Sequence, residues 1–168
     1  PRGRRRERPP RVGPGAGPPR VPADAVIGSD SAKGGSILLA SGGDLTIADG
    51  ARFDVTGKGT NERGGSVDLQ VALNGSIDVG AATFNVAGTG TGGSGQVRLR
   101  APQQMGDVAV ARWGATVNGG NTQLEAFRVY DLDDADGIAG NGFMAEIDTA
   151  LQNQVIADAT AFMTANGD

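Results

Sequence analysis

Hydrophobic and polar residues alternate in nine short stretches between residues 34 and 117. In each stretch of three residues the outer two are hydrophobic, and the middle one is polar except at Leu38 and Ala109. A period of two residues is that of a β-strand with one face buried and the other in solvent. The pattern therefore predicts nine short strands. Their middle residues are Leu38, Thr46, Asp54, Asp68, Asp78, Asn85, Arg98, Ala109 and Thr116.

The nine stretches form three groups, because the same order of strands recurs at a nearly constant interval. The first strand of each group starts at Ile37, Val67 and Val97, so the interval is 30 residues both times. Equivalent units at a fixed period stack on one another. Three strands per unit predict an all-β fold, namely a right-handed parallel β-helix with three strands per turn and about four turns. Each strand is expected to pair with its equivalent one turn later.

The inward residues of successive turns are expected to form vertical columns, one strand spacing of about 4.8 Å apart. The predicted columns are Ile37/Val67/Val97, Leu39/Leu69/Leu99 and Phe53/Phe84/Ala115.

Two further segments extend this pattern beyond the three groups. Residues 25–27 are predicted to end a preceding turn and to pack under Leu45 or Phe53. A fourth turn is expected in residues 124–130, because Phe127 follows Val97 by 30 residues. Pro102 is expected to end the strand before it.

The corners between these strands are rich in glycine, of which the chain has 29. Residues 57–64 and 88–95 are equivalent long corners. A glycine-rich loop can also bind phosphate, but neither GxxxxGK[ST] nor GxGxxG before a helix is present. Tight corners account for the glycines.

The composition predicts three regions: a disordered Arg/Pro/Gly-rich segment (1–25), the parallel β-helix (26–142) and a C-terminal amphipathic helix (143–168). Residues 1–22 hold seven arginines and one glutamate. They are interpreted as a linker, a basic arm for nucleic acid or anionic lipid, or the product of a mis-assigned start in a GC-rich genome.

The C-terminal helix is predicted from a hydrophobic stripe formed by Ile147, Leu151, Val155 and Phe162. It is expected to cover an open end or a side of the β-helix, or to interrupt it before further turns.

The chain has no cysteine and no histidine, which removes thiolate metal sites and the commonest general base. It has no apolar run of about 20 residues for a membrane span and no recognisable secretory signal. Because the net charge is -4 and the acidic residues lie in the body, nucleic-acid binding is not expected there.

Asp54, Asp68 and Asp78 are candidate carboxylates for the alternative of a carbohydrate-active enzyme, which needs two or three carboxylates that converge. They occupy different predicted strands of the turn and so project from different faces. The sequence therefore predicts no catalytic, cofactor-binding or metal-binding residue. Trp113 is a candidate platform for a sugar ring, but packing is the favoured interpretation.

Residues 131–136 contain four aspartates. They depart from the calcium loop pattern Asp-x-Asp-x-Asp-Gly, because position five is Ala135 and no glutamate follows at position twelve. A solvated acidic turn is favoured, and a calcium-stabilised adhesive repeat stays an alternative.

The chain resembles the filamentous haemagglutinin family of large exoproteins over roughly residues 30–165. The resemblance rests on GGSILLASGGDLTIADGARFDVTG (34–57), GGSVDLQVALNGSIDV (64–79), GQVRLRAP (95–102), DVAVARWGATVNGG (107–120), LEAFRVYDL (124–132) and ALQNQVIADATAFM (150–163).

The resemblance implies an internal shaft segment of a secreted or cell-surface β-helix protein of Gram-negative bacteria. The family serves in adhesion, biofilm formation or contact-dependent interaction, and the chain is not expected to be an enzyme. Its expected partners are the outer-membrane transporter of two-partner secretion and an unidentified receptor or glycan on a host or neighbouring cell. The family's N-terminal secretion domain and a C-terminal toxin domain are not recognisable here.

Overall fold

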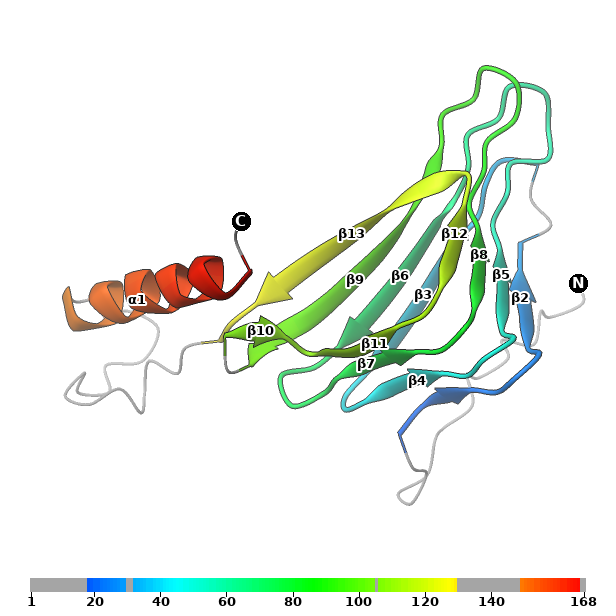
Figure 1. Cartoon of the computed structure of the whole chain (residues 1–168). Coiled ribbons are helices and arrows are strands. Elements are labelled where there is room, and N and C mark those ends of the chain that lie inside the picture. The colour runs from blue at the N-terminus through cyan, green and yellow to red at the C-terminus, as the bar shows by residue number, and fades with distance from the viewer. Residues whose placement is uncertain (1–17, 30–31, 105, 130–148, 167–168) are drawn as a thin grey trace, which may run out of the picture.

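The computed structural model describes residues 18–29, 32–104, 106–129 and 149–166. It confirms the predicted fold class: parallel strands stack into a three-walled β-solenoid, which one α-helix follows (Figure 1). The solenoid has about three full turns, flanked by a partial turn at each end, where about four turns were predicted.

Wall one is formed by the first strand of each turn. Its strands are β3 (Ser36–Ser41), β6 (Ser66–Val71), β9 (Gly95–Gln104) and β13 (Gly120–Phe127). All of them are parallel neighbours in that order, and the end of β9 also pairs antiparallel with β10 (Asp107–Val108).

Walls two and three are shorter and follow the same order. Wall two contains β1 (Arg20–Val21), β4 (Leu45–Ile47), β7 (Ile77–Val79) and β11 (Val110–Trp113). Wall three contains β2 (Val26–Gly28), β5 (Arg52–Asp54), β8 (Thr83–Asn85) and β12 (Thr116–Asn118). Each strand pairs in parallel with its equivalent one turn away.

The core lies in the narrow space between the three walls. Ile37, Val67 and Val97 are register partners in wall one, as predicted. Their neighbours Leu39, Leu69 and Leu99 form the second predicted column. The middle turn is the most completely buried, because it has a turn on either side. Val67, Leu69, Ile77, Val79 and Phe84 are all 0% exposed.

The third turn departs from the predicted register. Val117, and not Ala115, pairs with Phe84. In wall two Val110, and not Val108, pairs with Ile77, and the register shifts between Val110 and Arg112. The prediction that Pro102 ends its strand is wrong, because β9 runs through the buried Pro102 to Gln104 before it turns back as β10. Val108, which was predicted for wall two, therefore lies in this hairpin.

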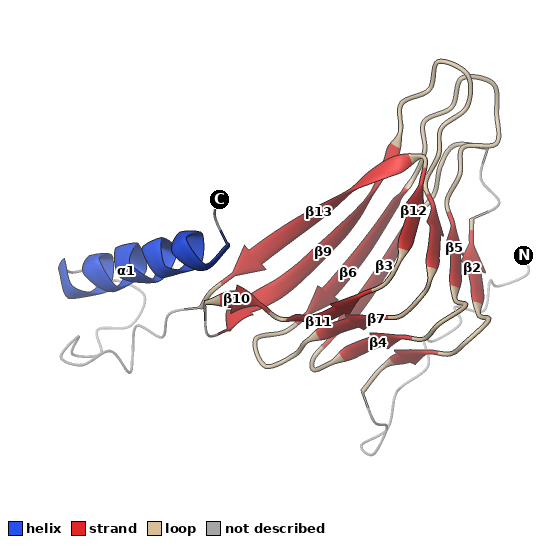
Figure 2. Ribbon diagram, in the orientation of Figure 1, coloured by secondary structure: helices blue, strands red, loops and turns tan. Residues whose placement is uncertain are grey.

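The fourth pass of wall one also differs in register. Gly120 pairs with Gly95 and Phe127 pairs with Pro102, so Phe127 is not the partner of Val97. The cause is the corner before β13. Gly119 alone, with φ +72°, joins β12 to β13, whereas the two lower turns use the long glycine-rich corners that project beyond the strands (Figure 2). A glycine adopts this left-handed conformation at little cost.

The solenoid starts earlier than the predicted boundary at residue 26. β1 lies within the segment that was predicted to be disordered, and it pairs with β4 through Arg20–Thr46 and Val21–Ile47. Val21 is 8% exposed, because its side chain extends the column of Ile47 and Val79. The predicted preceding turn is present, since Ile27 is the partner of Phe53. Residues 1–17 lie outside the described residues.

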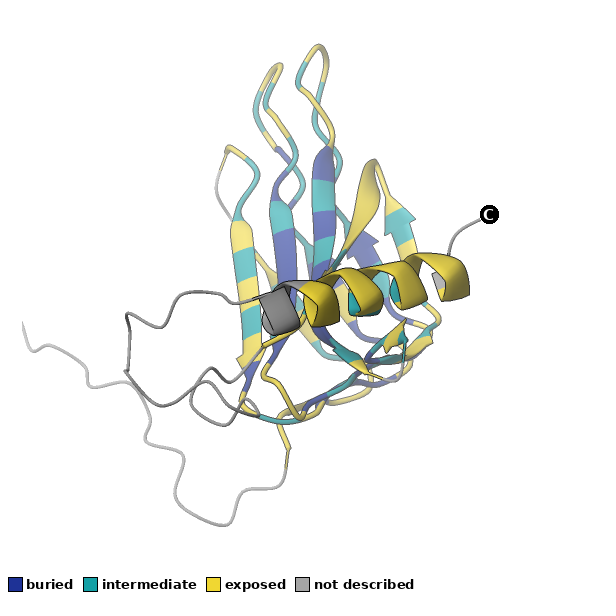
Figure 3. Ribbon diagram, turned by 90° about the vertical axis from the view of Figure 1, so that its left-hand side faces the viewer, coloured by how far each residue is buried: buried dark blue, intermediate teal, exposed yellow. Residues whose placement is uncertain are grey.

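The helix α1 spans Thr149–Asn166, within the region predicted to be helical. It lies beside β10 and extends away from the three walls (Figure 1), and most of its described surface is exposed (Figure 3). Arg128 Nη1 lies 3.1 Å from Asp158 Oδ1. Of the predicted stripe, Val155 is exposed and Phe162 is half-buried, whereas the next residue, Met163, is exposed. Ile147 and the side chain of Leu151 lie outside the described part.

Candidate functional site

The outer faces of the walls carry polar side chains that bind one another from turn to turn. On wall one, Arg98 Nε donates to Asp68 Oδ1 at 2.7 Å. On wall three, Asn118 Nδ2 donates to Asn85 Oδ1 at 2.8 Å. These contacts join register partners or near partners, so they tie successive turns together.

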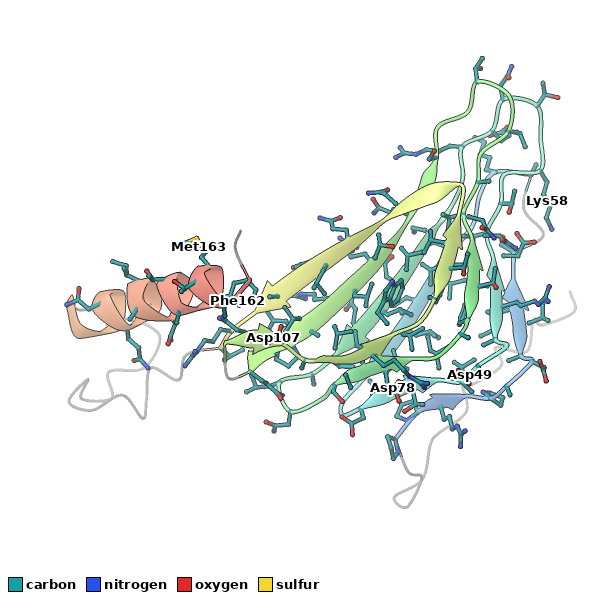
Figure 4. The ribbon with its side chains drawn as sticks, viewed as in Figure 1. Asp49, Lys58, Asp78, Asp107, Phe162 and Met163 are labelled. Carbon is teal, nitrogen blue, oxygen red and sulfur yellow. The ribbon has the colours of Figure 1, made fainter. Side chains whose placement is uncertain are left out.

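Wall two has the corresponding contact at its outer face. Arg112 Nε donates to Asp78 Oδ1 at 2.7 Å, and Arg112 Nη1 lies 3.7 Å from Asp49 Oδ1. Asp49 and Asp78 lie on the same outer side of the solenoid (Figure 4). The two carboxylates raise the pKa of Arg112, first through the hydrogen bond with Asp78. The group is a solvated ion-pair cluster.

The three candidate carboxylates lie on three different walls, as predicted from the sequence. Asp54 is on β5, Asp68 on β6 and Asp78 on β7. Asp68 and Asp78 each have an arginine partner. Asp54 accepts a hydrogen bond from the backbone N–H of Thr56 at 3.0 Å. The arrangement brings no two of these carboxylates together.

The environment of Asp54 favours its ionised form. Its pKa is lowered by a hydrogen bond from the Thr56 side chain, then by that of the Thr56 backbone N–H, and then by the charge of Lys58. A general acid needs the opposite shift. Among the described residues, no group of three Asp, Glu, His or Cys side chains is placed to hold a metal ion.

Trp113 is part of the core column of wall two. It pairs with Val79, it is half-buried, and its ring stacks on Phe84 with the centroids 5.8 Å apart. The geometry supports the packing interpretation of this residue. The acidic cluster at residues 131–136 lies outside the described residues.

A hollow of about 350 Å³ lies where the long corners enter wall one. Its lining comes from three successive turns: Gly34, Gly35, Ser36, Arg63, Gly64, Gly65, Ser66, Gly95 and Gln96. The hydroxyl oxygens of Ser36 and Ser66 are 3.1 Å apart and share a hydrogen bond. Ser66 is in turn the register partner of Gln96, so three polar side chains are stacked at the edge of the hollow.

The floor of the hollow is glycine backbone because the stacked corners approach one another closely. A Cβ atom on Gly64 would lie 1.9 Å from the carbonyl oxygen of Val86, and one on Gly65 would lie 2.1 Å from that of Gly35. Sequence analysis explained these glycines as corners and did not identify the hollow. The usable signal was a polar residue directly after a corner glycine in each turn, namely Ser36, Ser66 and Gln96, together with the basic residue Arg63 before the second corner.

The fold defines this chain as a parallel β-solenoid. Comparison with protein-family models, with curated proteins and with solved structures gave no match to it. No helix in the described part of the chain is both long and apolar enough to cross a membrane.

Proposed function

We propose that this chain is a structural and adhesive shaft segment of a secreted bacterial surface exoprotein. The observation that carries the proposal is the continuous in-register pairing of β3, β6, β9 and β13. A stack of this kind grows along one axis by adding equivalent turns, and it presents regularly spaced side chains on long outer faces. A stiff rod suits a protein that must hold a binding surface away from a cell.

The outer faces support a scaffold role over a catalytic one. Asp68 and Asp78 are engaged with arginines of the next turn, and Asp54 is held in its ionised form. These contacts stabilise the stack and leave no converging pair of carboxylates among them. The proposed role of the solenoid is therefore structural and not catalytic. The proposal also includes export by an outer-membrane transporter of the two-partner type.

Two measurements on cells that encode this chain test the proposal. Antibodies raised against the 168-residue chain are expected to label intact cells or the culture medium, and protease added to intact cells is expected to remove the signal. Signal confined to disrupted cells would refute secretion. A transporter gene beside the open reading frame is expected as well.

Adhesion is tested with purified protein. Beads coated with the chain are expected to bind host or bacterial cell surfaces more than beads coated with a Gly65→Val variant, in which the added side chain disrupts the stacked corner. Equal binding by the folded and the disrupted protein would contradict an adhesive role of the solenoid.

A further inference from the structure

Arg63, an exposed cation, is among the residues that line the hollow at the entry of wall one. None of the carboxylates in the described part of the chain forms an ion pair with Arg63. By contrast, Arg98, Arg100, Arg112 and Arg128 each have a carboxylate partner. Lys33 precedes Arg63 by 30 residues, so a second exposed cation occupies the same position of the repeat one turn below. No Asp or Glu is among the described residues that line the hollow.

Side chains are the groups that the hollow offers to a ligand here, because the backbone N–H groups of Gly34, Gly64, Gly65 and Ser66 are already used. Gly34 N donates to Arg63 O at 3.1 Å, and Gly64 N donates to Gly93 O at 2.9 Å. Ser36 and Ser66 use one hydroxyl hydrogen between them, which leaves another to donate. The amide of Gln96 adds two donors and an acceptor.

We propose that this hollow binds an acidic sugar residue, with its carboxylate on Arg63 and its hydroxyls on Ser36, Ser66 and Gln96. A planar guanidinium binds a carboxylate through two parallel hydrogen bonds. Hydroxyl and amide side chains, which both donate and accept, match the hydroxyl groups of a sugar ring. The glycine floor has no side chains, so a ring can approach the backbone. This inference deepens the proposed adhesive function and rests on it.

The polar ladder gives the site a direction along the solenoid. Ser36, Ser66 and Gln96 belong to three successive turns, about 4.8 Å apart. A chain of acidic sugars that runs parallel to the axis therefore meets a polar side chain at each turn. An acidic peptide has the carboxylates but lacks the ring hydroxyls, so it is expected to bind less well.

The test is a titration of the ¹⁵N-labelled 168-residue chain with trigalacturonate, triglutamate and maltotriose, followed by amide chemical shifts. Trigalacturonate is expected to shift the amides of Gly64, Ser66 and Gln96 and to bind at least about tenfold more tightly than the other two probes. Arg63→Gln is expected to weaken its binding by at least about tenfold, and Ser66→Ala by about fivefold. Arg52→Gln is the matched control, since it removes an exposed arginine from wall three, and it is expected to leave the affinity unchanged.

The proposal is overturned if trigalacturonate shifts none of these amides, if triglutamate binds as tightly, or if Arg63→Gln and Arg52→Gln have the same effect. Amide spectra without ligand show whether each variant is folded, so a loss of fold is told apart from a loss of binding. The bead assay separates this inference from the proposed function. If beads coated with the Arg63→Gln variant adhere as well as beads coated with the native chain, the hollow is not the adhesive site, and the adhesive function still stands. If the chain binds the sugar but the beads do not adhere, the adhesive role is refuted.

Discussion

Phe84 stacks on Phe53 of the turn below, with the ring centroids 4.6 Å apart and the ring planes 12° from parallel. Both rings are 0% exposed. Trp113 continues the stack at 5.8 Å from Phe84. The solenoid is thus held by an aromatic column in which the middle ring has a partner on each side.

Replacing Phe84 with alanine is expected to cost about 3–5 kcal/mol of unfolding free energy, because a large cavity opens between two aromatic neighbours. Phe84→Leu keeps much of the volume and is expected to cost clearly less. Phe127→Ala is the control, since Phe127 is half-buried at the end of β13. Urea unfolding followed by the fluorescence of Trp113, the single tryptophan, measures all three. Equal losses of unfolding free energy for Phe84→Ala and Phe127→Ala would contradict the view that the aromatic column stabilises the solenoid more than the end of β13 does.

Gly65→Ala is expected to lower stability by about 1–3 kcal/mol or more, because the new Cβ atom would lie 2.1 Å from the backbone oxygen of Gly35 and the stacked corners must separate. Gly43→Ala has the same chemistry in open space, with no other atom within 4 Å of the added Cβ. It is expected to be neutral or to stabilise by about 0.4–1 kcal/mol. Thermal unfolding of the two variants tests this, and the reverse order would refute the close packing of the corners.

Two ion pairs of equal length are expected to differ in strength because their burial differs. Arg98–Asp68 and Arg112–Asp78 are both 2.7 Å long, but the Asp68 side chain is 12% exposed and that of Asp78 is 37% exposed. Arg98→Gln leaves a largely buried carboxylate without its partner and is expected to cost about 1–3 kcal/mol. Arg112→Gln is expected to cost about 0.2–1 kcal/mol.

Double-mutant cycles with Asp68→Asn and Asp78→Asn measure the two couplings. Raised salt is expected to weaken the Arg112 pair more than the Arg98 pair. A larger coupling energy for the exposed Arg112–Asp78 pair than for Arg98–Asp68 would contradict the expected effect of burial.

Asp54 is expected to contribute to the acid sensitivity of the fold. Its pKa is lowered in the folded chain, chiefly by the Thr56 side chain. The stabilisation is therefore complete above the unfolded-state value of about 3.9 and is lost as the pH falls through the lower folded value. Asp54→Asn is expected to flatten the fall of the melting temperature below about pH 4, and Thr56→Val is expected to flatten it in part. An unchanged pH profile for Asp54→Asn would refute this source of acid sensitivity.

The sequence predicted the walls well where the repeat is strict. Ile37, Val67 and Val97 are hydrophobic, lie at equal intervals, and each follow a glycine two positions earlier (Gly35, Gly65 and Gly95), so their register was determined. The third turn could not be placed in the same way. The alternation through Ala115 and Val117 fits the core equally well when it is shifted by two residues, because a period of two cannot distinguish such shifts.

The bulge and the short corner are therefore visible only in the structure. The register shift after Val110 and the single-residue corner at Gly119 change the spacing without changing the hydrophobic pattern. The hollow beside Arg63 was missed for a related reason. Corner geometry explained its glycines fully. Which described carboxylates lie within reach of Arg63 depends on how the turns are arranged in space, and the sequence does not show it.

The corner at Gly119 shows that winding does not depend on how much chain separates wall three from wall one. A single residue serves there, whereas much longer excursions serve in the turns below, and the strands on either side still pair in parallel. Evolution can thus exchange these excursions, and a protein engineer can graft new ones, while the framework beneath them stays the same.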